Sequence, residues 1–181
     1  MRTIGEGLEQ AGSEFEDSYD QMIQAIEDEG QMSDSAEDYF EEAHSYISEE
    51  LGDFQTGVLS AHQKIQDASD IDDAEGATES LEDAGQSLAN AYNAARVAYN
   101  KAEGVISNGD EAITSDISAI DMSQDMSELH DAVDQKEQAF EMYQDVLDTA
   151  SAEVAEFYED HGLISNMDFG LEHQQPEELD F

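Results

Sequence analysis

The stretch that decides the fold is AEDYFEEAHSYISEELGDFQTGVLSAHQKIQDA, residues 36–68. Its apolar residues recur at steps of three and four, in the series Ala36, Phe40, Ala43, Ile47, Leu51, Phe54, Val58, Ala61, Ile65 and Ala68. A stripe with this spacing lies on one face of an α-helix, and here it is maintained for about five heptads. The sequence therefore predicts a long amphipathic helix that packs its apolar face against other helices.

The residues before this stripe predict where the helix begins. Asp34 is followed three residues later by Glu37, which is the spacing of a capping box, and the segment EGQMS at 29–33 reads as a break. We therefore expect Asp34 to be the N-cap residue of a helix near 34–69.

Comparable stripes predict the other helices. The segment near 73–106 carries a seam dominated by alanine, which permits the close approach of a neighbouring helix. Tyr92 and Tyr99 give it a second apolar edge. In the C-terminal half the stripe changes phase near residue 121, which leaves open whether 111–160 is one helix with a stutter or two helices. The expected helices are 3–28, 34–69, 73–106, 111–120 and 122–160.

These expected helices define the fold class. No segment alternates apolar and polar residues with the period of a β-strand, and the short turns require neighbouring helices to run antiparallel. The sequence predicts an all-α fold: an elongated antiparallel helical bundle of four or five helices, two or three of them long. We expect a bundle domain at 1–162 and an extended C-terminal tail at 163–181.

The charge predicts the environment in which the protein works. The chain has 47 Asp and Glu against 5 Lys and Arg, a formal net charge of -42. Such a balance is typical either of disordered chains or of proteins from molar salt, and the helical periodicity favours the second. At about 1 M salt the Debye length is about 3 Å, so neighbouring carboxylates barely repel one another. We expect hydrated K⁺ or Na⁺ ions at the surface, and a high-salt cytoplasm or a virion as the location.

Composition also bears on partners and location. The charge argues against binding nucleic acid or anionic lipid. There is no Cys, and the N-terminus MRTIGEGLEQ lacks the apolar core of a signal peptide. No apolar run approaches the roughly 20 residues that a membrane span needs.

Two segments resemble metal-binding motifs only in part. In DIDDAEGATESL, residues 70–81, three positions at which a calcium loop requires a particular residue type hold a different one. We therefore interpret Asp72 and Glu75 as a capping box at the start of the next helix. Glu41 and His44 have the Glu-x-x-His spacing of di-iron bundles, but such sites need the motif twice. We therefore expect no catalytic, cofactor-binding or metal-binding residues.

The basic residues within the predicted helices have intramolecular interpretations. If helices 34–69 and 73–106 are antiparallel about a turn near residue 71, Arg96 and Lys101 lie close to the level of Glu41 and Glu42 and form ion pairs with them. Lys136 falls on an apolar seam, where we expect its ammonium group to extend to solvent.

The tail LISNMDFGLEHQQPEELDF, residues 163–181, has isolated apolar residues separated by polar ones. It either folds back over its own bundle or docks on a neighbouring subunit, and the functional hypothesis is built on docking. The candidate docking residues are Leu163, Ile164, Met167, Phe169, Leu171, Leu179 and Phe181.

The functional hypothesis is a non-enzymatic structural protein of a halophilic archaeon or its virus, most concretely a capsid, neck or tail component of a virion. An acidic DNA-mimic decoy is the alternative, and a di-iron bundle enzyme is the least favoured. Binding to a basic nuclease would test the decoy.

Overall fold

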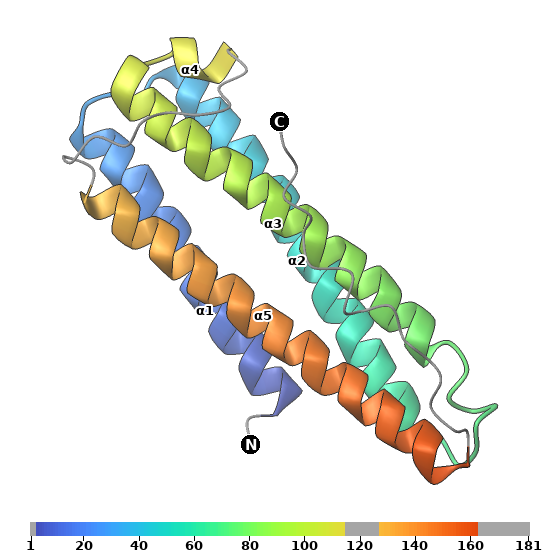
Figure 1. Cartoon of the computed structure of the whole chain (residues 1–181). Coiled ribbons are helices and arrows are strands. Elements are labelled where there is room, and N and C mark those ends of the chain that lie inside the picture. The colour runs from blue at the N-terminus through green and yellow to red at the C-terminus, as the bar shows by residue number, and fades with distance from the viewer. Residues whose placement is uncertain (1–2, 115–126, 163–181) are drawn as a thin grey trace.

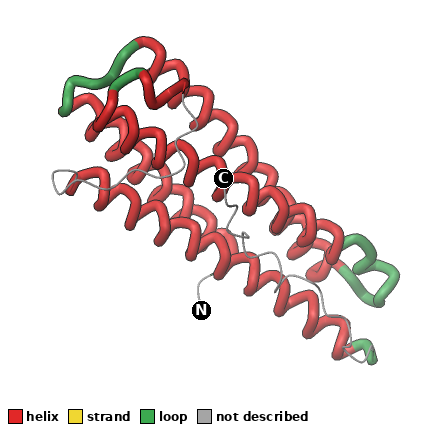
Figure 2. Tube along the Cα trace, turned by 45° about the horizontal axis from the view of Figure 1, so that its top comes forward, coloured by secondary structure: helices red, strands yellow, loops and turns green. Residues whose placement is uncertain are grey.

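The computed structural model describes residues 3–114 and 127–162, and these residues form helices and no strand. In chain order the helices are α1 (Ile4–Asp28), α2 (Asp34–Asp67), α3 (Ala77–Asn108), α4 (Glu111–Thr114) and α5 (Ser127–Asp160). The four long helices lie side by side and reverse direction from each to the next (Figures 1 and 2). The prediction of an all-α, elongated antiparallel bundle is confirmed. The phase change near residue 121 and the tail 163–181 lie outside the described residues.

The bundle is built from two closely packed helix pairs. α1 packs most extensively on α5, and α2 on α3 (Figure 1). Small residues permit this approach: a Cβ atom added at Gly7 would lie 2.6 Å from Val146 Cγ2, and one added at Gly57 would lie 2.9 Å from Ala84 Cβ. The predicted alanine seam of α3 is buried along its length. Small side chains thus bring the helices of each pair together.

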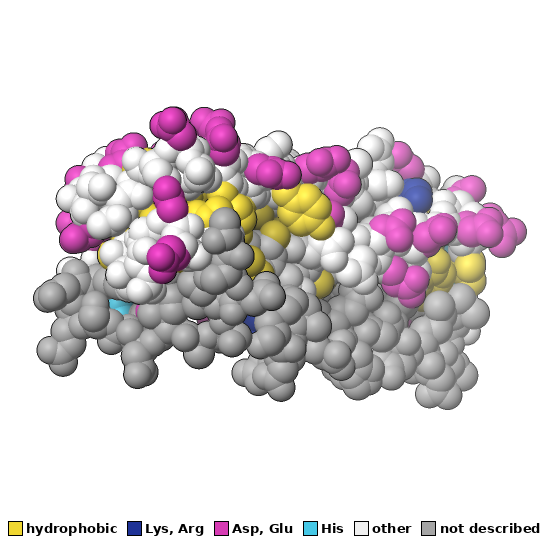
Figure 3. Space-filling model, turned by 90° about the horizontal axis from the view of Figure 1, so that it is seen from above, with side chains coloured by type: hydrophobic (Ala, Val, Ile, Leu, Met, Phe, Trp, Pro, Cys, Tyr) yellow, Lys and Arg dark blue, Asp and Glu magenta, His cyan; other side chains and the backbone are white. Residues whose placement is uncertain are grey.

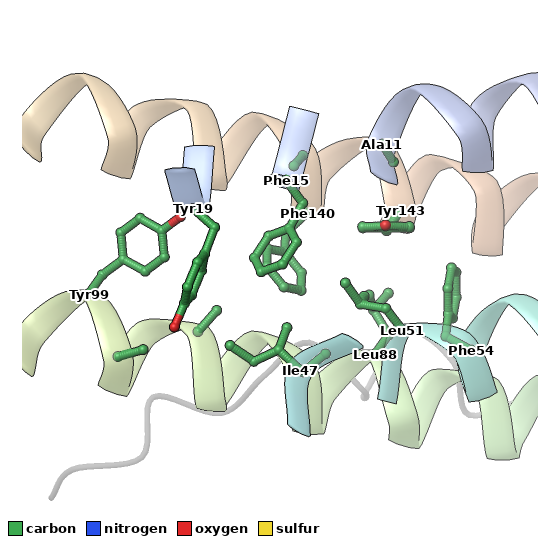
Figure 4. Packing of buried hydrophobic residues seen from close by; sticks show 14 of the residues in the cluster. Ala11, Phe15, Tyr19, Ile47, Leu51, Phe54, Leu88, Tyr99, Phe140 and Tyr143 are labelled. Carbon is green, nitrogen blue, oxygen red and sulfur yellow. The ribbon is translucent and has the colours of Figure 1, made fainter. Parts of the chain in front are cut away.

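Large side chains fill the space between the two pairs (Figure 4). Phe15 from α1 and Phe140 from α5 meet edge to face at 5.8 Å between ring centroids, and Phe54 from α2 meets Tyr143 at 5.5 Å. Phe15 and Phe54 are almost completely buried. Burial of such rings supplies much of the hydrophobic stabilisation of a core. Within the described residues, no helix is both long and apolar enough to cross a membrane.

Hydroxyl side chains cap the first two helices. Thr3 caps α1 in a capping box with Glu6. α2 is capped by Ser33, not Asp34: the Ser33 hydroxyl oxygen accepts from the Ala36 backbone N–H at 3.2 Å. Ser33 has the extended backbone of an N-cap residue, so Asp34 is already the first helical residue and complements the helix dipole there.

The predicted capping box of Asp72 and Glu75 is wrong, because α3 begins four residues later than expected. Residues 71–76 form turns, and Gly76, with φ 84°, redirects the chain into the helix. The neighbouring carboxylates stabilise this turn: Asp73 accepts from the Ser69 N–H and hydroxyl, and Asp70 accepts from the Asp73 N–H. These hydrogen bonds hold the pKa of the Asp73 carboxyl below its ordinary value. Side-chain hydrogen bonds to the backbone therefore stabilise a turn here, and the helix begins only after it.

Candidate docking groove

A groove of about 450 Å³ opens between α2 and α3. Its lining is mostly apolar. The residues are Tyr39, Glu42, Ala43 and Tyr46 from α2, and Asn90, Asn93, Ala94 and Val97 from α3.

The helical repeat explains why these residues share a surface. Tyr39, Ala43 and Tyr46 are spaced by four and three residues, so they form a second stripe that shares the half-buried Ala43 with the predicted apolar stripe of α2. On α3, Asn90, Ala94 and Val97 have the same spacing. Because the helices are antiparallel, the two stripes face each other across the groove.

Two contacts establish the register of α2 against α3. Asn90 Nδ2 donates to Glu50 Oε2 at 3.2 Å, and Gly57 meets Ala84. This register is close to the one predicted from a turn near residue 71. The predicted ion pairs of Arg96 and Lys101 with Glu41 and Glu42 stay a prediction. Lys101 Nζ also donates to the carbonyl oxygen of Ala112, at 3.0 Å, which ties α3 to α4.

The groove combines exposed aromatic surface with an unmet hydrogen-bond acceptor. Tyr46 is 46% exposed; the other large hydrophobic residue exposed in the described ranges is Leu59, at 40%. Tyr39 is half-buried, and burial together with Glu42 raises the pKa of its hydroxyl, which stays a neutral donor. Asn93 Oδ1 is buried and accepts no hydrogen bond. A segment bearing apolar side chains and backbone N–H groups suits this lining.

A second pocket, of about 370 Å³, lies between α1 and α2 and contains the Glu-x-x-His pair. His44 Nε2 lies 2.8 Å from Glu16 Oε2, and the imidazole ring lies 4.8 Å from the ring of Tyr19. Glu41 also lines this pocket. The described part of the chain brings no three His, Asp or Glu side chains together in a geometry that could hold a metal ion.

The prediction that Lys136 extends to solvent is wrong, because Lys136 is 3% exposed. Its ammonium group lies 2.7 Å from Glu137 Oε1, and 5.5 Å and 5.3 Å from the ring centroids of Tyr92 and Tyr99. The ammonium group thus lies over both rings of α3 and does not extend to solvent. Cation–π attraction and the carboxylate compensate the buried charge.

A neutral polar cluster lies beside Lys136. The Ser18 hydroxyl donates to the Ala132 carbonyl oxygen at 2.6 Å, and it therefore accepts from the Tyr99 hydroxyl, also at 2.6 Å. Burial raises the pKa of Tyr99 well above its ordinary value, so the phenol stays protonated. The cluster links α1, α3 and α5 and satisfies its own hydrogen bonds, which indicates a structural role.

The sequence-based site assignments meet this geometry only in part. The candidate docking residues Leu163, Ile164, Met167, Phe169, Leu171, Leu179 and Phe181 lie outside the described residues. The groove was not predicted, although the spacing of Tyr39, Ala43 and Tyr46 carries a signal for it. No family model matches the sequence, no curated protein matches it, and no solved structure matches the chain.

Proposed function

We propose that this protein is a non-enzymatic assembly component that works in molar salt and joins a larger protein particle through residues 163–181. Most concretely, it is a capsid, neck or tail component of a virus of a halophilic archaeon. The observation that carries the proposal is a mostly apolar groove on a bundle whose surface is dominated by carboxylates.

The surface supports a working environment of high salt. Over the described part of the face in Figure 3, carboxylates are spread widely, with hydrophobic side chains exposed between them. With 5 Lys and Arg against 47 Asp and Glu, most carboxylates have no basic side chain available as a partner. The carboxylates of such a surface repel one another in dilute buffer. At about 1 M salt the Debye length is about 3 Å, so this repulsion is largely screened.

The bundle supports a structural role. Its core is filled with small and aromatic side chains, and its buried serine and tyrosine hydroxyls bond to one another and to the backbone. A rigid, closely packed body with an apolar groove on its surface is suited to binding another protein segment. In this proposal, the apolar side chains of residues 163–181 are the groups that bind such a groove.

Dialysis from molar salt into dilute buffer tests the environment. The expected result is loss of helical circular dichroism as screening is lost. Unchanged helicity in dilute buffer would contradict the halophilic assignment.

Truncation after Gly162 tests assembly. In molar salt the full chain is expected to form an oligomer, and the truncated chain to be monomeric with its helicity intact. Helicity and native mass are measured on the same sample. Loss of helicity on truncation would show that the tail packs on its own bundle, and an unchanged oligomer would show that the tail is not the docking segment.

A further inference from the structure

We propose that the groove between α2 and α3 is the acceptor site for the segment Phe169-Gly170-Leu171 of a second copy of this chain. The inference rests on the proposed docking function and deepens it by naming the surface that receives the tail and the residues that enter it.

The first argument is the match between the groove length and the spacing of the apolar residues. The groove lining extends from Tyr39 to Tyr46 on α2, which is about 10 Å of helix. In an extended segment, side chains two residues apart point to the same side and lie about 6.8 Å apart. Two apolar pairs beyond Gly162 have this spacing: Phe169 with Leu171, and Leu179 with Phe181. Either pair fits the groove by length.

Charge distinguishes the two pairs. Glu42 lines the groove, and Glu50 accepts a hydrogen bond from the groove residue Asn90. The segment 163–171 contains one acidic residue, whereas 172–181 contains Glu172, Glu177, Glu178 and Asp180. Even in salt, carboxylates at contact distance repel one another. The groove therefore favours Phe169 and Leu171.

Reach then shows which chain supplies the segment. His62 of α2 lies 2.5 Å from Glu153 of α5, and these helices run in the same direction (Figure 1). Gly162 is therefore level with residue 71, and the near end of the groove, at Asn90 beside Glu50, lies about 31 Å back along the bundle. A fully extended chain takes Phe169 at most about 25 Å from Gly162. Phe169 thus falls short of the groove on its own chain, so a second copy must supply the segment in which Phe169 and Leu171 enter together.

The backbone of the segment also fits. Asn93 Oδ1 is a buried acceptor without a hydrogen bond at the groove, and an extended segment presents backbone N–H groups. Gly170, between the two apolar residues, has no side chain to prevent close approach of its backbone. The incoming segment therefore supplies a donor for Asn93 Oδ1, the groove residue's buried acceptor.

The absence of Cys from the chain permits a direct test by disulfide crosslinking. Full-length chains carrying Glu42→Cys are mixed, in molar salt under mild oxidation, with full-length chains of different tag length carrying Asp168→Cys. The matched control replaces Glu42→Cys with Glu41→Cys, which removes the same charge one residue away, but in the pocket facing α1. The expected result is a mixed covalent dimer that forms at least tenfold faster with Glu42→Cys than with the control. Equal rates, or no crosslink, would overturn the inference.

A third experiment tests whether the groove instead binds Leu179 and Phe181 from the tail of its own chain. One chain carrying both Glu42→Cys and Asp180→Cys is expected to give no intramolecular disulfide. A crosslinked monomer would overturn the inference, because the groove would then bind the end of its own tail.

The native mass of the uncrosslinked full chain separates this inference from the proposed function. An oligomer that requires the tail but gives no crosslink at Glu42→Cys removes the groove and leaves the proposed function standing. A full chain that is monomeric at all concentrations overturns both.

Discussion

Replacing Gly57 with Ala tests the close contact between α2 and α3. In an exposed helix interior, Gly→Ala stabilises a protein by about 0.8–1 kcal/mol through helix propensity. At Gly57 the added Cβ would lie 2.8 Å from the backbone oxygen of Ser80 and 2.9 Å from Ala84 Cβ. Neither atom is the end of a flexible side chain, so the helices must separate, and such overpacking costs about 1–3 kcal/mol. The net expectation is destabilisation by about 1 kcal/mol.

Gly52→Ala is the matched control on the same helix. A Cβ at Gly52 meets nothing within 4 Å. This variant is therefore expected to be stabilised by the full helix-propensity gain of about 0.8–1 kcal/mol. The free energies of unfolding of the two variants should then differ by about 2 kcal/mol, which separates their melting temperatures by about 4–8 °C. Thermal melts followed by circular dichroism in molar salt measure this difference. A Gly57→Ala variant that melts at or above Gly52→Ala would refute the close packing of α2 on α3.

Four further substitutions test three buried residues and the carboxylate that pairs with one of them. Leu88→Asp places an unpaired carboxylate on the buried seam of α3 and should destabilise by about 3 kcal/mol or more; an unchanged melting temperature would contradict that seam. Burial raises the pKa of the Glu103 carboxyl above its ordinary value of 4.5, so its contribution to stability is present below that value and is lost as pH rises through the folded-state pKa. Glu103→Gln should therefore raise the melting temperature at about pH 7 and not at about pH 4, and an equal gain at both would contradict the burial argument. Lys136→Met, which replaces a buried charge by an apolar side chain of similar length, should be nearly neutral; Glu137→Gln should be more destabilising, by about 1–2 kcal/mol, because it leaves the ammonium group without its carboxylate. Denaturant unfolding in molar salt compares these two variants, and the reverse order would refute the pairing.

The positions of the helices could be predicted because the information is local. The stripe from Ala36 to Ile65 depends only on residues three and four apart, and the structure places α2 where the stripe predicts it. Breakers between stripes are equally local, as at Gly30 and at Gly162, where positive φ angles end the helices. Cap residues were less predictable. Ser33 and Asp34 are both good N-cap residues, and only the backbone conformation distinguishes them.

The environment of individual side chains required the tertiary structure. Lys136 lies on an apolar seam, and from sequence alone the ammonium group could equally extend to solvent. The rings of Tyr92 and Tyr99, from a helix more than thirty residues earlier, cover it.

The groove likewise depends on how two helices are rotated about their axes. The spacing of Tyr39, Ala43 and Tyr46 is present in the sequence, but a second apolar stripe can be buried by a third helix or left open. By itself the sequence determined the helices, their order and the acidic surface, since these follow from composition and near-neighbour spacing. Which stripes meet, which charge is buried and which apolar surface stays exposed were decided by the tertiary structure, because they depend on contacts between residues distant in sequence.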